Sequence, residues 1–206
     1  TNLKCSIILS LRGTHINISP MSDKNLASLY RKYFPKVKKF HAVSNSIALE
    51  ATKYGVEMNK VMVINPAVDE KFLVNKRSHG GTINSDILNI ISVGRCHWIK
   101  GYTFALDAMT ILKKKAVQFH YTIIASGKDS ENICYQIHDL GLDKYVTFVN
   151  GLSHDKVIKR LSESNLFLLP SLNEGISNAV LESMALGIPV ISTECGGMAE
   201  LIKNGY

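Results

Sequence analysis

Short apolar runs alternate along this chain with segments whose apolar positions recur three and four residues apart. The runs predict strands at residues 4–11, 39–43, 61–64, 87–93, 119–125, 145–148, 166–169 and 188–192. The periodic segments predict helices at residues 22–34, 44–54, 102–114, 130–140, 154–162, 177–186 and 198–203. This alternation indicates right-handed βαβ crossovers and therefore an α/β fold built on parallel, doubly wound sheets, with ligands at the carboxyl ends of the strands.

One stretch interrupts the alternation. Residues 69–86 lose their periodicity and collect Gly, Asn, Ser and charged residues, which is typical of an interdomain linker. We therefore expect residues 1–68 to be the C-terminal part of one domain and residues 87–206 to form a second domain. The chain also ends soon after its last predicted helix, so the sequence reads as a fragment of a larger protein.

Composition and charge narrow the classes of function. With 46% apolar and 20% charged residues, the chain is ordinary globular material. No apolar run is long enough to span a membrane, so the default location is cytoplasmic. The four cysteines and seven histidines show no metal-ligand spacing, and we expect neither a metal site nor a cofactor. The net charge of +7 suits a phosphate-bearing ligand or an anionic membrane surface, and no nucleic-acid partner is expected.

The stretch around Glu174 concentrates residues that packing alone explains poorly. It lies between a predicted strand and a helix that begins near Ser177. The first N–H groups of such a helix have no partner within the helix, and Gly175 allows a ligand to approach them closely. A helix start of this kind attracts an anion. The helix is expected to end at Gly187, and a third ligand-facing turn is expected at Gly196–Gly197, before residue 198.

A second group of candidates follows the first strand of the second domain. Gly94 and Arg95 come directly after that strand, and Lys100 follows shortly afterwards. An arginine and a lysine at the ligand edge of a sheet could hold a diphosphate from two sides, although solvation of surface cations is the simpler alternative. Neither a phosphate-binding P-loop nor a G-x-G-x-x-G fingerprint is present.

Two glutamates, Glu174 and Glu182, suggest an acid and base pair, but spacing alone does not establish one. Glu182 falls on the second turn of the predicted helix, among apolar and small residues. A carboxylate in that setting needs a partner, and a vicinal diol offers two hydroxyl donors to its two oxygens. The alternative is a helix glutamate paired with solvent or a nearby cation.

These residues, in this order, resemble the donor-binding domain of retaining glycosyltransferases with the GT-B fold, specifically glycosyltransferase family 4. The resemblance covers nearly all of residues 87–206. The matching segments are Ser92-Val93-Gly94-Arg95 with Lys100-Gly101, Val146 to Gly151, Leu168 to Ser171, Glu174-Gly175, Leu181 to Ala185, Gly187, Pro189-Val190, Gly196-Gly197 and Glu200 to Ile202.

The resemblance implies a role for each matched position. Arg95 and Lys100, next to Gly94, would hold the diphosphate of a UDP-, GDP- or similar nucleotide sugar, and Glu182 would bind its ribose hydroxyls. Glu174 would face the transferred sugar. The loop at Asn150 and Gly151 would lie near the base. Backbone N–H groups that would contact the sugar or phosphate belong to Gly175, Ile176, Ser177 and Asn178.

The implied reaction is transfer of a sugar to a glycan or lipid-linked acceptor, with retention of configuration and without a metal, as in polysaccharide biosynthesis. A non-catalytic nucleotide-sugar-binding module and a nucleotide-sugar epimerase on the same fold are the alternatives. The residues that family members use for the acceptor lie largely before Thr1, and the place of their histidine is taken by Arg12, with His15 close by. The basic segment 31–39 could contact the inner face of a membrane, or could be a solvated helix end.

Overall fold

The computed structural model describes residues 6–74 and 86–203, which form two compact units. Unit 1 contains residues 6–66 together with 173–177 and 194–203, and unit 2 contains residues 67–74, 86–172 and 178–193. Unit 1 is therefore assembled from three separate pieces of the chain. Each unit is built on its own parallel sheet, so the predicted α/β class is confirmed.

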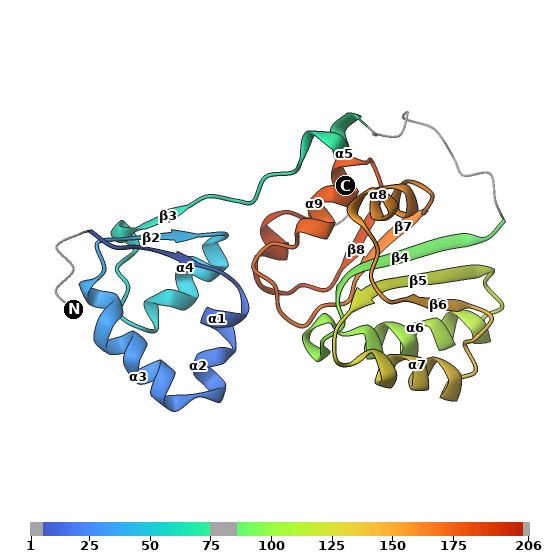
Figure 1. Cartoon of the computed structure of the whole chain (residues 1–206), viewed down its shortest axis with the longest axis horizontal. Coiled ribbons are helices and arrows are strands. Elements are labelled where there is room, and N and C mark those ends of the chain that lie inside the picture. Colours follow the sequence, from blue (N-terminus) through green and yellow to red (C-terminus); the bar gives the residue numbers. More distant parts are fainter. Residues whose placement is uncertain (1–5, 75–85, 204–206) are drawn as a thin grey trace. The chain divides into compact units, whose positions relative to one another are not determined.

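Unit 1 contains a three-stranded sheet in the order β1-β2-β3, with helices on one side of it (Figure 1). Its strands are β1 (Ile8–Leu11), β2 (Lys39–Ala42) and β3 (Val61–Val63), and its longer helices are α3 (Lys24–Tyr33) and α4 (Asn45–Thr52). These elements agree with the prediction to within two residues, except at the start of the first strand: residues 6–7 are not part of β1, and residues 4–5 lie outside the described residues. Buried aromatic rings form much of the core, including Phe34 stacked on Tyr30 with ring centroids 4.3 Å apart.

After β1, the mostly polar run Thr14-His15-Ile16-Asn17 predicts a loop, and this prediction is wrong. Two short helices form there, α1 (Thr14–Asn17) and α2 (Ser19–Ser22). Gly13, at φ 30°, turns the chain into α1, and Ile16 anchors that helix because only 2% of it is exposed. Pro20 lies in the first turn of α2, where a missing N–H has no cost. Ile16 is the one apolar residue of α1, and a single apolar position gives no helical period that the sequence could show.

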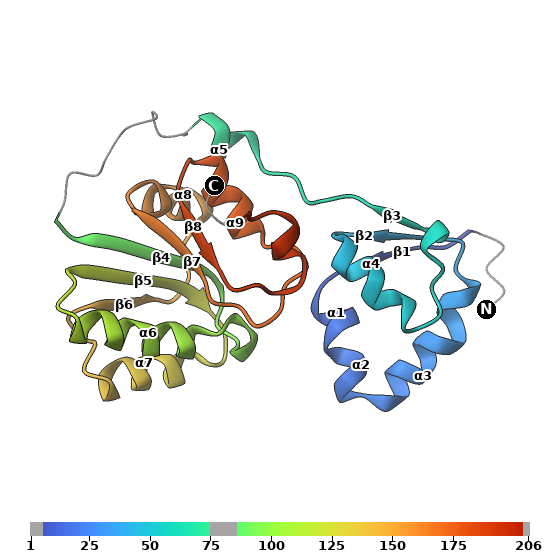
Figure 2. The same cartoon turned by 180° about the vertical axis from the view of Figure 1, so that it is seen from behind.

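Unit 2 contains a five-stranded parallel sheet in the order β6-β5-β4-β7-β8. The strands are β4 (Leu88–Arg95), β5 (Phe119–Ser126), β6 (Val146–Val149), β7 (Leu166–Leu169) and β8 (Val190–Ser192). The helices are α6 (Tyr102–Lys114), α7 (Ser130–Asp139), α8 (His154–Ser162) and α9 (Asn178–Ala185). Figures 1 and 2 show α6 and α7 on one face of this sheet and α8 and α9 on the other.

The order of the strands places a switch point in the middle of this sheet. The chain proceeds outward from β4 to β5 and β6, and then returns to the other side of β4 with β7 and β8. Crossovers on opposite faces separate at such a point, and ligands of open α/β sheets bind outside the carboxyl ends of the strands there. Arg95 is the last residue of β4 and therefore lies at the switch point.

Two other parts of the chain differ from the prediction. Helix α5 (Glu70–Val74) forms inside the predicted linker, because fully buried Phe72 packs its ring against His154 at 5.2 Å between centroids. The expected α-helix at 198–203 is instead the 3₁₀ helix η4 (Gly196–Glu200). Residues 75–85 of the linker lie outside the described residues, and the boundaries at 68 and 86 stay predictions. The other 3₁₀ turns are η1 (Phe34–Lys36), η2 (Met58–Lys60) and η3 (Trp98–Lys100).

The end of α9 follows the prediction closely. Gly187 has φ 77°, its N–H donates to Met184 O at 3.0 Å, and the Ile188 N–H donates to Ser183 O at 3.0 Å. These two bonds form a Schellman motif, which satisfies carbonyl groups that the helix end would leave unpaired. The glycine therefore fixes the point at which the chain leaves α9 toward β8.

Candidate functional site

The carboxyl ends of three strands meet at one edge of the unit 2 sheet. Arg95 of β4 lies opposite Ser126 of β5, and the Cys96 N–H donates to the Ser126 carbonyl at 2.7 Å. Gly151 follows β6 with φ 70°, and a Cβ on it would lie 3.6 Å from the Cβ of Ser126. The structure thus brings the predicted residue Arg95 to the same sheet edge as the Asn150–Gly151 turn. Both Arg95 and Asn150 are exposed and available to a ligand.

The side chain of Lys100 lies over Gly94. A Cβ on Gly94 would be 3.0 Å from the Tyr102 hydroxyl, which is tight, and 3.5 Å from Lys100 Cε, which is ordinary contact. Gly94 therefore leaves room for the Tyr102 hydroxyl, and the lysine side chain packs beside it. Because Lys100 is half-buried, its aliphatic part is packed while the ammonium end is left near the strand end that carries Arg95.

The loop that carries Lys100 is fixed to the end of β7. The Ile99 carbonyl accepts a 2.7 Å hydrogen bond from the Leu172 N–H. Gly101 is left-handed at φ 64°, and a Cβ on it would lie only 2.0 Å from the Pro170 carbonyl oxygen. The end of β7 therefore fixes the backbone of this loop, and with it the point from which the Lys100 side chain extends.

Glu182 lies on the second turn of α9 and is half-buried. Burial raises the pKa of its carboxyl group, and the nearby charge of His154 partly opposes this shift. The half-buried position leaves the carboxylate incompletely solvated. Hydroxyl groups that donate to it would replace the lost water, so the diol hypothesis fits the position. The alternative hypothesis pairs Glu182 with solvent or a nearby cation, and the candidate for that cation is His154, at the start of α8.

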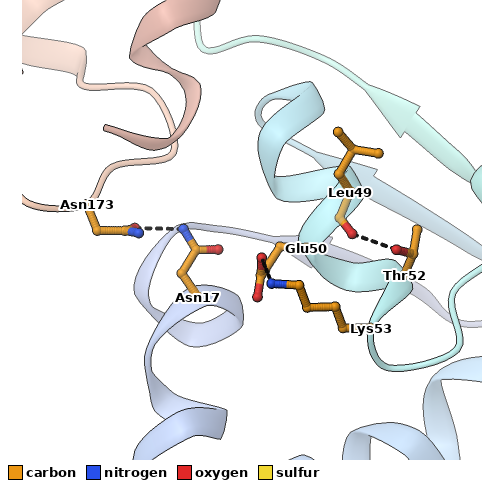
Figure 3. A network of polar contacts seen from close by, with 6 residues as sticks. All are labelled: Asn17, Leu49, Glu50, Thr52, Lys53 and Asn173. Atoms are coloured by element: carbon orange, nitrogen blue, oxygen red, sulfur yellow. Dashed lines mark hydrogen bonds and ion pairs between the residues drawn. The ribbon is translucent and has the colours of Figure 1, made fainter. Parts of the chain in front are cut away.

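The loop that carries Glu174 belongs to unit 1, where residues of the N-terminal segment contact one side of it. Gly175 is buried, and a Cβ on it would lie 2.8 Å from a methyl group of Val43 and 3.5 Å from the Gly13 nitrogen. The Asn17 side-chain amide donates to Asn173 Oδ1 at 2.6 Å (Figure 3). Glycine at position 175 is therefore required by close packing and not by a left-handed backbone.

The Gly196–Gly197 turn covers another side of the same loop. The Gly197 N–H donates to the Glu174 carbonyl at 3.3 Å. A Cβ on Gly196 would lie 1.8 Å from that oxygen, and one on Gly197 would lie 2.0 Å from the Gly175 carbonyl oxygen. The turn that was predicted to face a ligand packs against the loop backbone, and its role toward a ligand stays a prediction.

The predicted cradle of N–H groups is partly engaged. The Ser177 N–H is directed at the thioether of Met198, 3.5 Å from nitrogen to sulfur. Sulfur is a weak acceptor, so a ligand oxygen would be a better partner for this N–H. Helix α9 begins at Asn178, one residue after Ser177, in agreement with the predicted helix start.

The structure therefore divides the predicted site residues between the two units. Unit 2 carries the predicted diphosphate, base and ribose contacts, namely Gly94, Arg95, Lys100, Asn150, Gly151 and Glu182, with Asn178 at the start of α9. Unit 1 carries the loop from Glu174 to Ser177. The roles themselves stay predictions.

Sequence reasoning missed the residues that hold this loop. Asn17 is 91% buried, and its Oδ1 accepts no hydrogen bond, which is costly for a buried polar atom and is usually tolerated only at sites with a further purpose. Nothing in the local sequence around Asn17 could have indicated its contact with Asn173. Glu200 belonged to the resemblance but received no role, although its carboxylate accepts hydrogen bonds from Asn45 and Ser46.

In the two described ranges, no three His, Cys, Asp or Glu side chains are grouped as metal ligands. Within the same ranges, no helix is both long and apolar enough to cross a bilayer.

Comparison with known families gives one match over most of the chain. Residues 76–206 match the family model described as "Glycosyl transferases group 1". Among curated relatives, the amylovoran biosynthesis glycosyltransferase AmsK of Erwinia amylovora is 38% identical over 123 residues, which are 57% of this chain and 30% of AmsK. The N,N'-diacetylbacillosaminyl-diphospho-undecaprenol alpha-1,3-N-acetylgalactosaminyltransferase of Campylobacter jejuni is 28% identical over 190 residues, 87% of this chain and 48% of that protein. This chain thus spans less than half of either relative.

Solved structures show the same fold. The Anabaena protein HepE, in complex with UDP and glucose, superposes with a TM-score of 0.80 at 18% identity, covering 97% of this chain and 56% of HepE. TarM of S. aureus gives a TM-score of 0.80 at 17% identity, over 99% of this chain and 40% of TarM. At such identities the likeness concerns the fold, which is of the Rossmann-like GT-B type, as predicted.

Proposed function

The chain belongs to the family of glycosyl transferases group 1, and from this premise we propose that its protein transfers a sugar from a nucleotide-diphosphate sugar to a glycan or lipid-linked acceptor, with retention of configuration. The observation that carries the proposal is the placement of Arg95 and Lys100 at the switch point of the unit 2 sheet. Two cations held by rigid backbone at that edge suit a diphosphate. The UDP in the HepE structure and the diphospho-undecaprenol in the name of the Campylobacter relative support the two substrate classes.

The chemistry of the step follows from this charge. Transfer breaks the bond between the anomeric carbon and a diphosphate oxygen and forms a bond from that carbon to an acceptor oxygen. Negative charge develops on the departing diphosphate, where Arg95 and Lys100 would stabilise it. The acceptor hydroxyl loses its proton, and the departing phosphate oxygen would accept it. Neither a cofactor nor a side-chain nucleophile is required.

Three further contacts would orient the donor. The Glu182 carboxylate would accept hydrogen bonds from the ribose hydroxyls, and the Asn150–Gly151 turn would lie against the base. Glu174 would face the transferred sugar, with the N–H groups of residues 175–178 around it. The basic segment 31–39, whose Lys32 and Lys36 lie over the ring of Tyr33, would provide peripheral contact with the inner face of a membrane carrying the acceptor.

Calorimetry with a panel of nucleotide sugars tests the donor site on the 206-residue chain. We expect one donor class to bind, and Arg95→Ala and Glu182→Ala each to weaken its affinity by about tenfold or more, since each removes a charged partner. Arg160→Ala, which removes an exposed arginine on α8, is the matched control and should leave the affinity unchanged. A folded sample that binds none of the panel would refute the assignment.

A turnover assay on the longer protein tests the reaction. Product anomers read by NMR should keep the donor's configuration. A changed sugar still attached to the nucleotide would indicate an epimerase, and donor binding without any turnover would indicate a binding module.

A further inference from the structure

Glu200 joins the end of η4 to the start of α4 within unit 1. Its Oε2 accepts hydrogen bonds from the Asn45 N–H and from the Asn45 side-chain amide, both at 2.9 Å. Its Oε1 accepts from the Ser46 N–H at 2.8 Å. A carboxylate at a helix N-terminus is favoured by the unpaired N–H groups and by the helix dipole. Together with Ser44 Oγ, which accepts from the Ile47 N–H at 3.2 Å, it satisfies the first three N–H groups of α4.

The other end of η4 lies against the loop that carries Glu174. Gly196 and Gly197 open η4, and their backbone contacts the Glu174 and Gly175 carbonyls, as described above. A Cβ on Gly197 would also lie 2.7 Å from the Ser44 Cβ, so α4, η4 and the loop touch at one point. Because η4 is one short rigid turn, holding its Glu200 end holds its glycine end as well.

The loop is thus enclosed by two sets of contacts. On one side are Gly13, Val43 and the Asn17–Asn173 hydrogen bond, and on another is the glycine turn of η4. The second side is tied by a charge, because the Glu200 carboxylate holds the far end of η4 to Asn45 and Ser46. The position of the Glu174 backbone is therefore expected to depend on the Glu200 side chain.

We propose that Glu200 is a positioning residue for sugar transfer: by clamping η4 to α4 it fixes the Gly196–Gly197 turn and through it the loop that presents Glu174 to the transferred sugar. This inference rests on the proposed function. It differs from a merely structural cap because its effect is directed to one part of the ligand. The contribution of the sugar to the binding affinity should depend on Glu200. The affinity for the nucleoside diphosphate should not, since the diphosphate and ribose contacts belong to unit 2.

The test compares each nucleotide sugar with its own nucleoside diphosphate, for example UDP-glucose with UDP, by calorimetry on the 206-residue chain. Using the donor found in the panel, the ratio of the two affinities measures the contribution of the sugar. In Glu200→Ala we expect this ratio to fall by about tenfold toward unity while the affinity for the diphosphate stays within about twofold. A melting curve recorded on the same sample reports the fraction that is folded.

Two further variants make the result specific. Glu200→Gln keeps the length and one acceptor oxygen but loses the charge, and should recover part of the ratio. Glu194→Ala removes an exposed carboxylate from the same segment and should leave the ratio at the wild-type value. Equal losses for sugar and diphosphate in Glu200→Ala, or an unchanged ratio, would overturn the inference while leaving the donor site in place. If the wild-type chain binds no donor at all, the proposed function has failed instead.

Discussion

The cation group of unit 2 and the Glu174 loop of unit 1 are constructed in different ways. Arg95 and Lys100 lie on or beside a regular strand, and hydrogen bonds of the sheet and the β7 end fix their backbone. The Glu174 loop has no regular structure and is held by segments far away in the sequence, such as Asn17, 156 positions from Asn173. The cations are thus placed by sheet topology, whereas the Glu174 loop is placed by contacts with distant segments of the chain.

The largest effect on either region is expected from a substitution at Gly101. In Gly101→Ala the new Cβ would lie 2.0 Å from the Pro170 carbonyl oxygen on a left-handed backbone, so β7 or the Lys100 loop must move. We expect unfolding of unit 2 to become easier by about 3 kcal/mol.

Trp98 provides the measurement for this variant, because it is the single tryptophan of the chain and lies three residues from Gly101 in unit 2. Its fluorescence should report the lowered midpoint in urea. An unchanged midpoint would show that the Pro170 contact does not hold the loop.

The matched substitution in unit 1 is Gly196→Ala. Its Cβ would lie 1.8 Å from the Glu174 carbonyl oxygen, at φ 53°, so the loop has to shift. Because the loop is at the edge of a small unit, we expect a smaller loss of stability, about 1–2 kcal/mol. The Trp98 transition should not move, while the preference for nucleotide sugar over nucleoside diphosphate should be lost. A lowered Trp98 midpoint would contradict the separation of the two regions.

The smallest effect is expected at Glu182, and it depends on pH. Burial raises the folded-state pKa of this carboxyl above its ordinary value of 4.5, so its contribution to stability is full below pH 4.5 and is lost as pH rises through the folded-state pKa. Glu182→Gln removes the cost of burying the charge. At pH 7 the variant should therefore be more stable than wild type, by less than about 1 kcal/mol because the group is partly solvated.

Thermal melts at pH 4 and pH 7 check this sign, since the two proteins should converge at the lower pH. The same variant should bind the nucleotide sugar more weakly at pH 7, because an amide offers one acceptor oxygen where the carboxylate offers two. A variant that is less stable than wild type at pH 7 would indicate that Glu182 has a structural partner.

The sequence was most informative where local rules decide the structure. The predicted bounds of α6 are those observed, because its apolar period is regular and a glycine precedes it. Gly187 was placed correctly because a helix end requires a left-handed residue. The alternation of strands and helices gave the strand ends to within two residues, so that Arg95, expected just after a strand, is in fact the last residue of β4.

It was least informative where distant contacts decide. Helix α5 forms because Phe72 finds a buried place beside His154, which its own neighbours in the sequence do not indicate. The 3₁₀ form of η4 follows from the packing of its glycines against the Glu174 loop, where an α-helix starting at Met198 was expected. The Asn17–Asn173 and Asn45–Glu200 hydrogen bonds join residues so far apart in the sequence that no periodic pattern of residues indicates them.

The composition of unit 1 from three pieces also sets an order of events during synthesis. Glu200 bonds to Asn45, 155 positions earlier, so the contacts between the N-terminal sheet and η4 form only after nearly the whole of unit 2 has been made. Closing so long a loop is slow compared with forming the local βαβ contacts of unit 2. We therefore expect unit 2 to fold first, and the Glu174 loop to take its final shape only after η4 has been made.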